Sequence, residues 1–383
     1  MTTLARTHVA SRRNVPPFDF LLVGATLLVS AIGVVMVYTA TRGSLLAQGE
    51  DPKTFLKKQG LFVVLGCIVM VVVAVIDYRR WEPLANILYW LIVLALLGVY
   101  VAGNSAQGAA RWFSLGPLQL QPSEFAVLAL ILAVSSYCAR RDEEGLAWRD
   151  VFRLLIMAAI PTALVLVQPD LGTAMIMVIV LLVLLAVAGL PIRILVMLLI
   201  GTALVVLFAV ESGLLHKYQI ARVTAFLNPG EKSNNPYVQS AIYNLSQAKN
   251  AIGSGGIFGA GIGHGAQTNL GYVPEQQTDF IFTAIGEQLG FVGSVGVISL
   301  LGIVAWRVLR AAVVARDTFG RLICSGLFAF IAFSVFQNAG MTMGIMPITG
   351  IPLPFVSYGG TAVLVFFSAI GLALSVGARR RHR

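Results

Sequence analysis

The strongest constraint on this chain is a series of long apolar segments separated by shorter polar ones. Each is roughly 17–25 residues long, the length that a bilayer-spanning α-helix requires. Only 11% of the 383 residues are charged, against about 25% in soluble domains. The sequence therefore predicts an all-α polytopic membrane protein with about ten transmembrane helices. The predicted helices begin near Phe20, Leu61, Leu84, Phe125, Leu154, Leu171, Ile194, Phe280, Leu322 and Thr361.

Basic residues are unevenly distributed among the polar segments. If the N-terminus is cytoplasmic, the segments on that side hold 18 of the 27 Lys and Arg residues. This bias follows the positive-inside rule and predicts that both termini are cytoplasmic. The basic excess is therefore mostly topological, with some attraction to anionic membrane lipid. We do not expect nucleic-acid binding, because no basic patch is interleaved with aromatic residues.

The order of these segments predicts a single membrane domain with two tails. Residues 1–18 form a cytoplasmic N-terminal tail, 19–376 the ten-helix domain, and 377–383 a basic cytoplasmic tail. Residues 211–278 form a large extracellular loop between helices 7 and 8, and a loop of this length is usually functional. Its middle, 237–252, is predicted to be an amphipathic helix at the membrane interface. The glycines at 253–265 indicate flexible or tightly packed backbone, because no βαβ unit surrounds them.

Two carboxylates, Glu275 and Asp279, lie where this loop enters the eighth apolar segment. A carboxylate at a membrane surface is costly to desolvate and by default marks a functional site. Acids are also common in the first turn of a helix, where the macrodipole favours them. If the helix begins here, the four-residue spacing places both carboxylates on one face.

Other polar side chains gather at the same ends of the predicted helices. Any one of them is compatible with a structural role, because side chains next to a span can snorkel to the interface. Together they predict a cavity, open to the outer leaflet, that holds both cations and carboxylates. Such a cavity suits an anionic lipid, because Lys and Arg bind phosphate oxygens and a carboxylate can act as a base. The residues at these ends, Glu275 and Asp279 included, are Lys57, Lys58, Gln59, Arg111, Trp112, Gln121, Ser123, Glu124, Gln168, Asp170, Lys249, Glu275, Asp279, Glu287 and Ser357.

Six short motifs occur in a specific order along the chain. They are Arg-Trp at 111–112, Gln-Pro-Ser-Glu at 121–124, Gln-Pro-Asp-Leu-Gly-Thr at 168–173, Lys-Asn-Ala-Ile-Gly-Ser-Gly-Gly at 249–256, Pro-Glu and Thr-Asp-Phe-Ile-Phe within 274–282, and Pro-Leu-Pro-Phe-Val-Ser-Tyr-Gly-Gly at 352–360. This order resembles the SEDS family (shape, elongation, division and sporulation) from about Phe20 to Val376. Residues 264–267 and 351–354 are more similar to its elongation type than to its division type. In relatives a lysine often follows Gln-Pro-Ser-Glu by three residues, where this chain has Val127.

The resemblance implies a peptidoglycan glycosyltransferase that polymerises lipid II at the extracellular face of the bacterial cytoplasmic membrane. It implies that Asp279, in the Thr-Asp-Phe motif, is essential, and we expect it to be the general base of an inverting reaction. The predicted cofactor is at most a divalent cation, Mg²⁺ or Mn²⁺. The expected partners are a class B penicillin-binding protein, which is a transpeptidase, and other components of the elongation complex. The predicted substrate-binding residues are Lys58, Arg111, Trp112, Glu124, Lys249, Glu275 and Ser357.

Three alternatives stay open at this point. A lipid II flippase or transporter has a similar fold, and fold does not determine function. A transporter is, however, expected to show matching halves, and the sequence has none. The second alternative is a division-type polymerase. The third is a scaffold that recruits a partner, although a scaffold does not need Asp279 beside a cationic cavity.

Overall fold

The computed structural model describes residues 19–102, 104–106, 109–115, 118–141, 145–211, 217–229 and 233–379. The predicted tail at 1–18 and most of the tail at 377–383 lie outside this range. Each predicted apolar segment coincides with one long helix in the described part of the chain. These helices are α1 (Phe20–Ala47), α2 (Thr54–Val75), α3 (Trp81–Ala102), α4 (Pro122–Ala139), α5 (Trp148–Val167), α6 (Leu171–Val187), α7 (Ile192–Glu211), α11 (Ile281–Val313), α12 (Thr318–Met343) and α13 (Gly360–Ala378).

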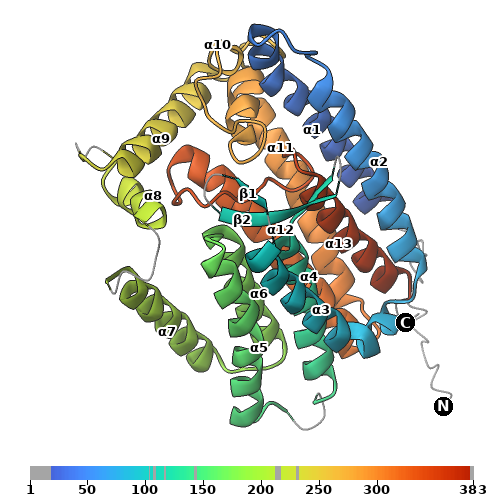
Figure 1. The fold of residues 1–383 in the computed structure, drawn as a ribbon. Coiled ribbons are helices and arrows are strands. Elements are labelled where there is room, and N and C mark those ends of the chain that lie inside the picture. The colour runs from blue at the N-terminus through green and yellow to red at the C-terminus, as the bar shows by residue number, and fades with distance from the viewer. Residues whose placement is uncertain are drawn as a thin grey trace, which may run out of the picture.

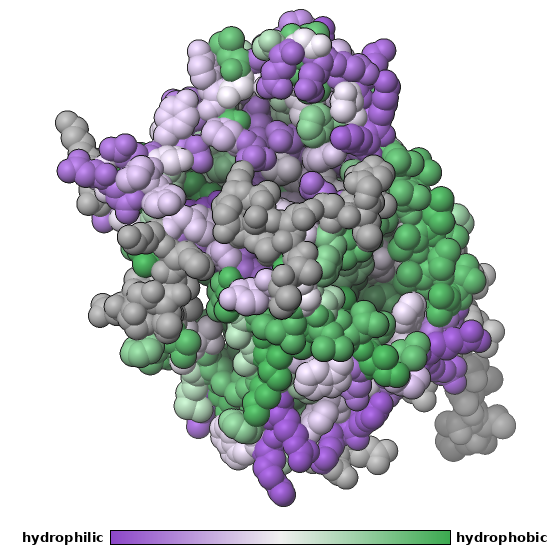
Figure 2. Space-filling view, in the orientation of Figure 1, coloured by the Kyte–Doolittle hydropathy of each residue, from purple (hydrophilic) through white to green (hydrophobic). Residues whose placement is uncertain are grey.

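Eight of these described helices are long and apolar enough to cross a membrane. The other two, α6 and the apolar part of α7 (Ile192–Val205), are apolar but shorter. Figure 2 shows a broad apolar band between polar surfaces at opposite ends of the molecule. The chain is therefore a multi-pass membrane protein, and the count of ten crossings stays a prediction.

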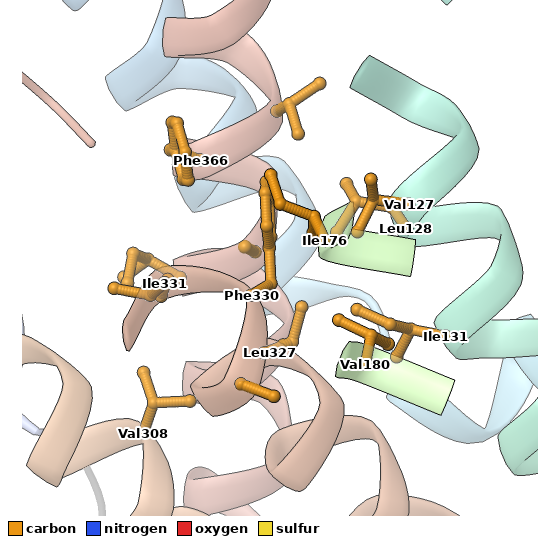
Figure 3. Packing of buried hydrophobic residues seen from close by; sticks show 14 of the residues in the cluster. Val127, Leu128, Ile131, Ile176, Val180, Val308, Leu327, Phe330, Ile331 and Phe366 are labelled. Atoms are coloured by element: carbon orange, nitrogen blue, oxygen red, sulfur yellow. The ribbon is translucent and has the colours of Figure 1, made fainter. Parts of the chain in front are cut away.

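The centre of the bundle is α12, which packs against α4, α6, α11 and α13. Figure 3 shows Leu327 and Phe330 of α12 among apolar side chains of α4 and α6. Gly326 allows the close approach, because a Cβ there would lie 3.0 Å from the side chain of Ile131 on α4. Small residues at such contacts let membrane helices pack closely.

Hydrogen bonds and ion pairs between helix ends hold the arginine-rich end of the bundle. Arg307, near the end of α11, donates to both carboxylate oxygens of Asp19, which caps α1, at 3.1 and 2.8 Å. Tyr78, in the short helix η1 (Tyr78–Arg80), donates to Asp317 at the start of α12 at 2.7 Å. Arg379 donates to the last carbonyl of α2 at 2.6 Å. The two ends of the described chain therefore lie at one end of the bundle.

The opposite end carries a cap of three shorter helices, drawn from yellow-green to gold along the left and top of Figure 1. They are α8 (Lys217–Leu227), α9 (Pro236–Ser254) and α10 (Ala266–Asn269). They come from the loop predicted at 211–278, and α9 confirms the helix predicted at 237–252. We call α8–α10 the cap below.

A small antiparallel sheet was not predicted, so the all-α description was wrong in this detail. Its strands are β1 (Asn104–Ala106), β2 (Ala109–Leu115) and β3 (Leu118–Leu120), in the order β1-β2-β3. In the second pair Phe113 is opposite Leu120 and Leu115 is opposite Leu118. The pairing satisfies backbone groups that a loop beside the membrane would otherwise leave without partners. Strands this short carry too few residues for a clear alternating pattern.

The glycine-rich segment is tightly packed backbone, one of the two predicted possibilities. It lies against α11, which is interrupted at Gly290, where φ is 67° and ψ is −165°. The interruption frees backbone groups of α11, and the segment pairs with them. The hydrogen bonds are Ala260 N–H to Glu287 O at 2.9 Å, Gly261 N–H to Gln288 O at 3.0 Å, Phe291 N–H to Gly256 O at 2.9 Å and Val292 N–H to Ile257 O at 3.1 Å.

Candidate active site

The Thr-Asp-Phe motif lies in an irregular turn that precedes α11. Because α11 begins at Ile281, the helix does not include Glu275 or Asp279, and the shared helical face is not formed. Glu275 has a left-handed φ of 49°. Its carbonyl accepts from the N–H groups of Thr278 at 3.2 Å and Phe280 at 3.3 Å. This turn leaves Glu275 exposed and Asp279 half-buried.

Two buried side chains hold the backbone of this turn. Asn338 of α12 donates to the carbonyls of Asp279 and Ile351, both at 2.7 Å. The Ser357 hydroxyl donates to the carbonyl of Thr278 at 2.5 Å. The motif at 352–360 therefore supports the aspartate-bearing turn through backbone contacts. The structure places Ser357, a predicted substrate-binding residue, in this supporting position.

Asp279 and Arg222 border the same space over Gly350. A Cβ on Gly350 would lie 3.1 Å from Oδ2 of Asp279 and 3.6 Å from Nη1 of Arg222. Arg222, on α8, stacks on the ring of Tyr218 at 5.0 Å. The Tyr218 hydroxyl in turn donates to the carbonyl of Pro169 at 2.5 Å. The cap therefore places the Arg222 guanidinium close to the Asp279 carboxylate.

Arg222 was not among the predicted site residues. The available signal was its four-residue spacing from Tyr218, which places the two on one helical face. That spacing predicts the stack but does not indicate which carboxylate the guanidinium faces.

Three of the sequence motifs meet in one hydrogen-bonded network. The Trp112 indole donates to the Gln121 side chain at 3.0 Å. Gln121 and Ser123 both donate to Oδ2 of Asp170, at 3.3 and 3.2 Å. Asp170 caps α6 by accepting from the N–H of Thr173 at 3.0 Å. This network fixes the orientation of the half-buried Trp112 indole.

Glu124, next to this network in sequence, has a carboxyl oxygen without a partner in the described part of the chain. Its Oε2 is buried and has no hydrogen-bond partner among the described residues. Val127, three residues later on α4, is buried among the apolar side chains of Figure 3. Residues three apart are neighbours on a helix surface. The position at which relatives often have lysine is therefore next to an unpaired carboxyl oxygen.

We expect Val127→Lys to be tolerated because the new ammonium can pair with Glu124. A double-mutant cycle with Glu124→Gln should give a favourable coupling of about 0.5–3 kcal/mol, the range for residues in direct contact. Thermal unfolding in detergent gives the stability of the wild type, the two single variants and the double variant. Strictly additive changes would show that the two side chains do not meet.

Lys58 and Lys249 lie on the same end of the bundle, each against a different element. The Lys58 ammonium is 5.9 Å from the ring centre of Phe55, and this ring meets that of Tyr358 at 4.8 Å. Burial raises the pKa of Tyr358, so its phenol is neutral at pH 7. The Lys249 ammonium lies over Gly344 at the C-terminal end of α12, where the helix dipole favours a cation.

The remaining predictions concern Arg111 and a metal ion. Arg111 lies in β2, but its side chain is outside the described part of the structure. No cluster of three His, Cys, Asp or Glu side chains occurs among the described residues. The protein groups described here therefore do not form a complete cation shell. Mg²⁺ is commonly held by one or two carboxylates together with substrate phosphates, and this arrangement is compatible with Glu275 and Asp279.

Comparison with known proteins identifies the family. The model of the FtsW, RodA and SpoVE family, described as cell cycle protein, matches residues 19–382. The chain belongs to this family. The peptidoglycan glycosyltransferase MrdB of Escherichia coli K12 is 38% identical over 339 residues, which cover 88% of each chain. A probable peptidoglycan glycosyltransferase FtsW of Trichlorobacter lovleyi is 34% identical over 365 residues, covering 94% of this chain and 93% of that protein.

A solved structure supports the same assignment. A chain from a peptidoglycan synthase complex, described for its coordination of polymerisation and crosslinking, matches with a TM-score of 0.78. It is 31% identical and the match covers 94% of this chain and 97% of that chain. The SEDS resemblance is therefore confirmed. The fold expected from it, a mostly helical multi-pass membrane protein, is confirmed as well. Both FtsW and MrdB relatives match, so membership alone does not distinguish a division type from an elongation type.

Proposed function

We propose that this chain polymerises lipid II into glycan strands during cell-wall elongation and releases undecaprenyl diphosphate. As a member of the FtsW, RodA and SpoVE family it is a peptidoglycan glycosyltransferase. One observation carries the assignment of the site. The half-buried carboxylate of Asp279 borders the same space as the guanidinium of Arg222, in a turn held by Asn338 and Ser357.

Asp279 acts as the general base in this proposal. Its carboxylate accepts the proton of the 4-hydroxyl on the acceptor's N-acetylglucosamine. The oxygen then bonds to the anomeric carbon of the donor's N-acetylmuramic acid while the bond from this carbon to the diphosphate oxygen breaks. The configuration inverts from α to β. Undecaprenyl diphosphate leaves as a stable anion, so protonation by a second carboxyl group is not required.

Arg222 is the cation proposed to assist the departure of the diphosphate. Negative charge develops on the diphosphate as the bond breaks, and a guanidinium positioned for that charge stabilises the transition state. Its planar donors also suit two phosphate oxygens at once. Lys58, Lys249 and Arg111 are proposed to bind the diphosphates around the space between Asp279 and Arg222. Trp112 is proposed to stack on a sugar.

A divalent cation would enter this site with the substrate. Glu275 is exposed in the same turn as Asp279 and is the carboxylate proposed to hold it, with diphosphate oxygens as the other ligands. When bound, the ion would neutralise diphosphate charge. The described residues bind and orient the two sugars whether or not the ion is present.

The site is proposed to face the extracellular side of the bacterial cytoplasmic membrane. Arginines concentrate at the opposite end of the bundle, which by the positive-inside rule is the cytoplasmic end. Both ends of the described chain lie there, next to Arg307 and Arg379. We extend this topology to ten crossings, with α6 and α7 as the two shorter ones.

The proposed partner is a class B penicillin-binding protein, a transpeptidase that crosslinks the new strands. The matched chain in a peptidoglycan synthase complex supports such a pairing. The elongation type is preferred because residues 264–267 and 351–354 are more similar to that type. Other components of the elongation complex are expected to join this pair.

Purified protein tests the proposed function directly. We expect glycan strands from lipid II with the wild type, alone or with its cognate transpeptidase, and none with Asp279→Ala. A control polymerase verifies the substrate. If neither protein forms glycan but the wild type moves labelled lipid II across vesicles, the flippase is the correct alternative.

We expect Gly350→Ala to lower the polymerisation rate by at least about tenfold, because displacement by about 1 Å can cost up to 100-fold. The new Cβ would lie 3.1 Å from the Asp279 carboxylate. Alanine at the left-handed φ of 79° is also strained, by about 1–2 kcal/mol. Gly49→Ala is the matched control, since Gly49 has a φ of 74° and open space around its Cβ position. Equal rates in the two variants would mean that encroachment on Asp279 has no effect.

A further inference from the structure

The loop that pairs with the broken part of α11 is apolar and uncharged. We call residues 256–262 the seam loop. Between Lys249 and Glu275 the sequence contains no Asp, Glu, Lys or Arg. Within the seam loop, Phe258 is 81% exposed and Ile257 63%. Ile262 is also exposed. Large apolar side chains with this exposure are unfavourable in water, so an apolar environment is expected to cover them.

The seam loop continues an apolar surface of a spanning helix. Two of its hydrogen bonds accept from the N–H groups of Phe291 and Val292, which are themselves exposed on α11. Val295, one turn further along, is exposed as well. Exposed apolar residues on a membrane-spanning helix face lipid. The loop side chains therefore extend a lipid-facing surface sideways from α11.

The depth of the loop follows from the charges on α11. The helix runs from Gln288 to Trp306 without a charged residue, which is about 28 Å at 1.5 Å per residue. This length is close to the hydrocarbon thickness of about 30 Å. Arg307 pairs with Asp19 at the far end. The Gly290 break and the seam loop therefore lie at the boundary of the hydrocarbon on the Asp279 side.

The backbone pairing explains how a helix can be broken at this depth. Unpaired N–H and C=O groups are not tolerated against lipid, so irregular backbone there must be satisfied by protein. The seam loop supplies this through four hydrogen bonds to residues on both sides of Gly290. The glycines permit the contact, since a Cβ on Gly259 would lie 2.2 Å from the carbonyl oxygen of Gln288.

We propose that the seam loop is a membrane anchor. Ile257, Phe258 and Ile262 insert among the lipid chains of the leaflet on the Asp279 side. The anchor also sets the depth of the cap, because Glu287 next to the break accepts from the backbone of Gln267 and Thr268 at 2.7 and 2.9 Å. The anchor thereby holds the cap and the Asp279 turn at a constant height above the hydrocarbon. This proposal does not depend on the catalytic role assigned to Asp279.

Nitroxide accessibility in vesicles tests the anchor. Single cysteines replace Phe258, His264 or Phe291 in a full chain with Cys67→Ala, Cys138→Ala and Cys324→Ala. The labelled proteins are placed in vesicles of phosphatidylethanolamine and phosphatidylglycerol. We expect collisions with oxygen to exceed those with a water-soluble nickel complex at 258 and 291. His264, exposed in the same glycine-rich segment, is the control at which we expect the preference to reverse.

Two results would overturn the anchor. A label at 258 that prefers the nickel complex, as at 264, would place the loop in water. A label at 258 that loses access to both reagents and becomes immobile only when the cognate transpeptidase is added would assign the surface to a protein partner. Each labelled protein must keep the melting temperature of its cysteine-free parent, so that a change in accessibility reports on position.

Discussion

Asp279→Ala is expected to stop glycan formation from lipid II, with a rate at least about 100-fold below that of the wild type. This is the lower end of the 10²–10⁴-fold contribution of a general base. The substitution should leave the fold intact, because the turn is held through the backbone carbonyls of Thr278 and Asp279 by Ser357 and Asn338. Initial rates of polymerisation by purified protein are the measurement.

Two further variants separate basicity from shape. Asp279→Asn keeps the size of the side chain but cannot accept the proton, so it should be as inactive as alanine. Asp279→Glu keeps the charge but moves the carboxylate by roughly 1 Å, which can cost about 100-fold. Glu275→Gln, in the exposed part of the same turn, should have a smaller effect. Wild-type rates in Asp279→Asn would exclude a base at this position.

The helices were the predictable part of this fold. Inside a bilayer a chain must satisfy its own backbone, so a long apolar segment has almost no alternative to a helix. The strands at 104–120 and the break at Gly290 were not predictable in this way. The break depends on pairing with the seam loop, which is distant in sequence. The local sequence shows the glycines, but it does not show that they contact the backbone of α11 around Gly290.

The candidate site was predictable only in part. Asp279 stands out because a carboxylate precedes an apolar segment, and the family motif adds its expected role. The position of Arg222 depends on a chain of tertiary contacts, from Pro169 through Tyr218 to the space over Gly350. No local pattern encodes such a chain. The sequence therefore indicates the proposed base, Asp279, but not the guanidinium that borders the same space.

The second large effect is expected from Arg222→Ala. Loss of one positioned donor to a developing charge usually costs about 10²–10³-fold in the rate of the chemical step. Arg222→Lys should recover part of this loss, because lysine keeps the charge but not the planar pair of donors. The measurement is the kcat and KM of lipid II polymerisation with the cognate transpeptidase present.

Tyr218→Phe is the matched control for the position of Arg222. It keeps the ring on which the guanidinium stacks but removes the hydrogen bond to Pro169. We therefore expect a loss smaller than that of Arg222→Ala.

The division of the Arg222→Ala effect between kcat and KM decides the role of the guanidinium. A lower kcat with little change in KM means that Arg222 contacts charge that exists only in the transition state. A raised KM with unchanged kcat means that it binds ground-state diphosphate equally well, as a cation that only binds substrate would. The second outcome would move the electrophilic role from Arg222 to another cation of the site, while leaving Asp279 as the base.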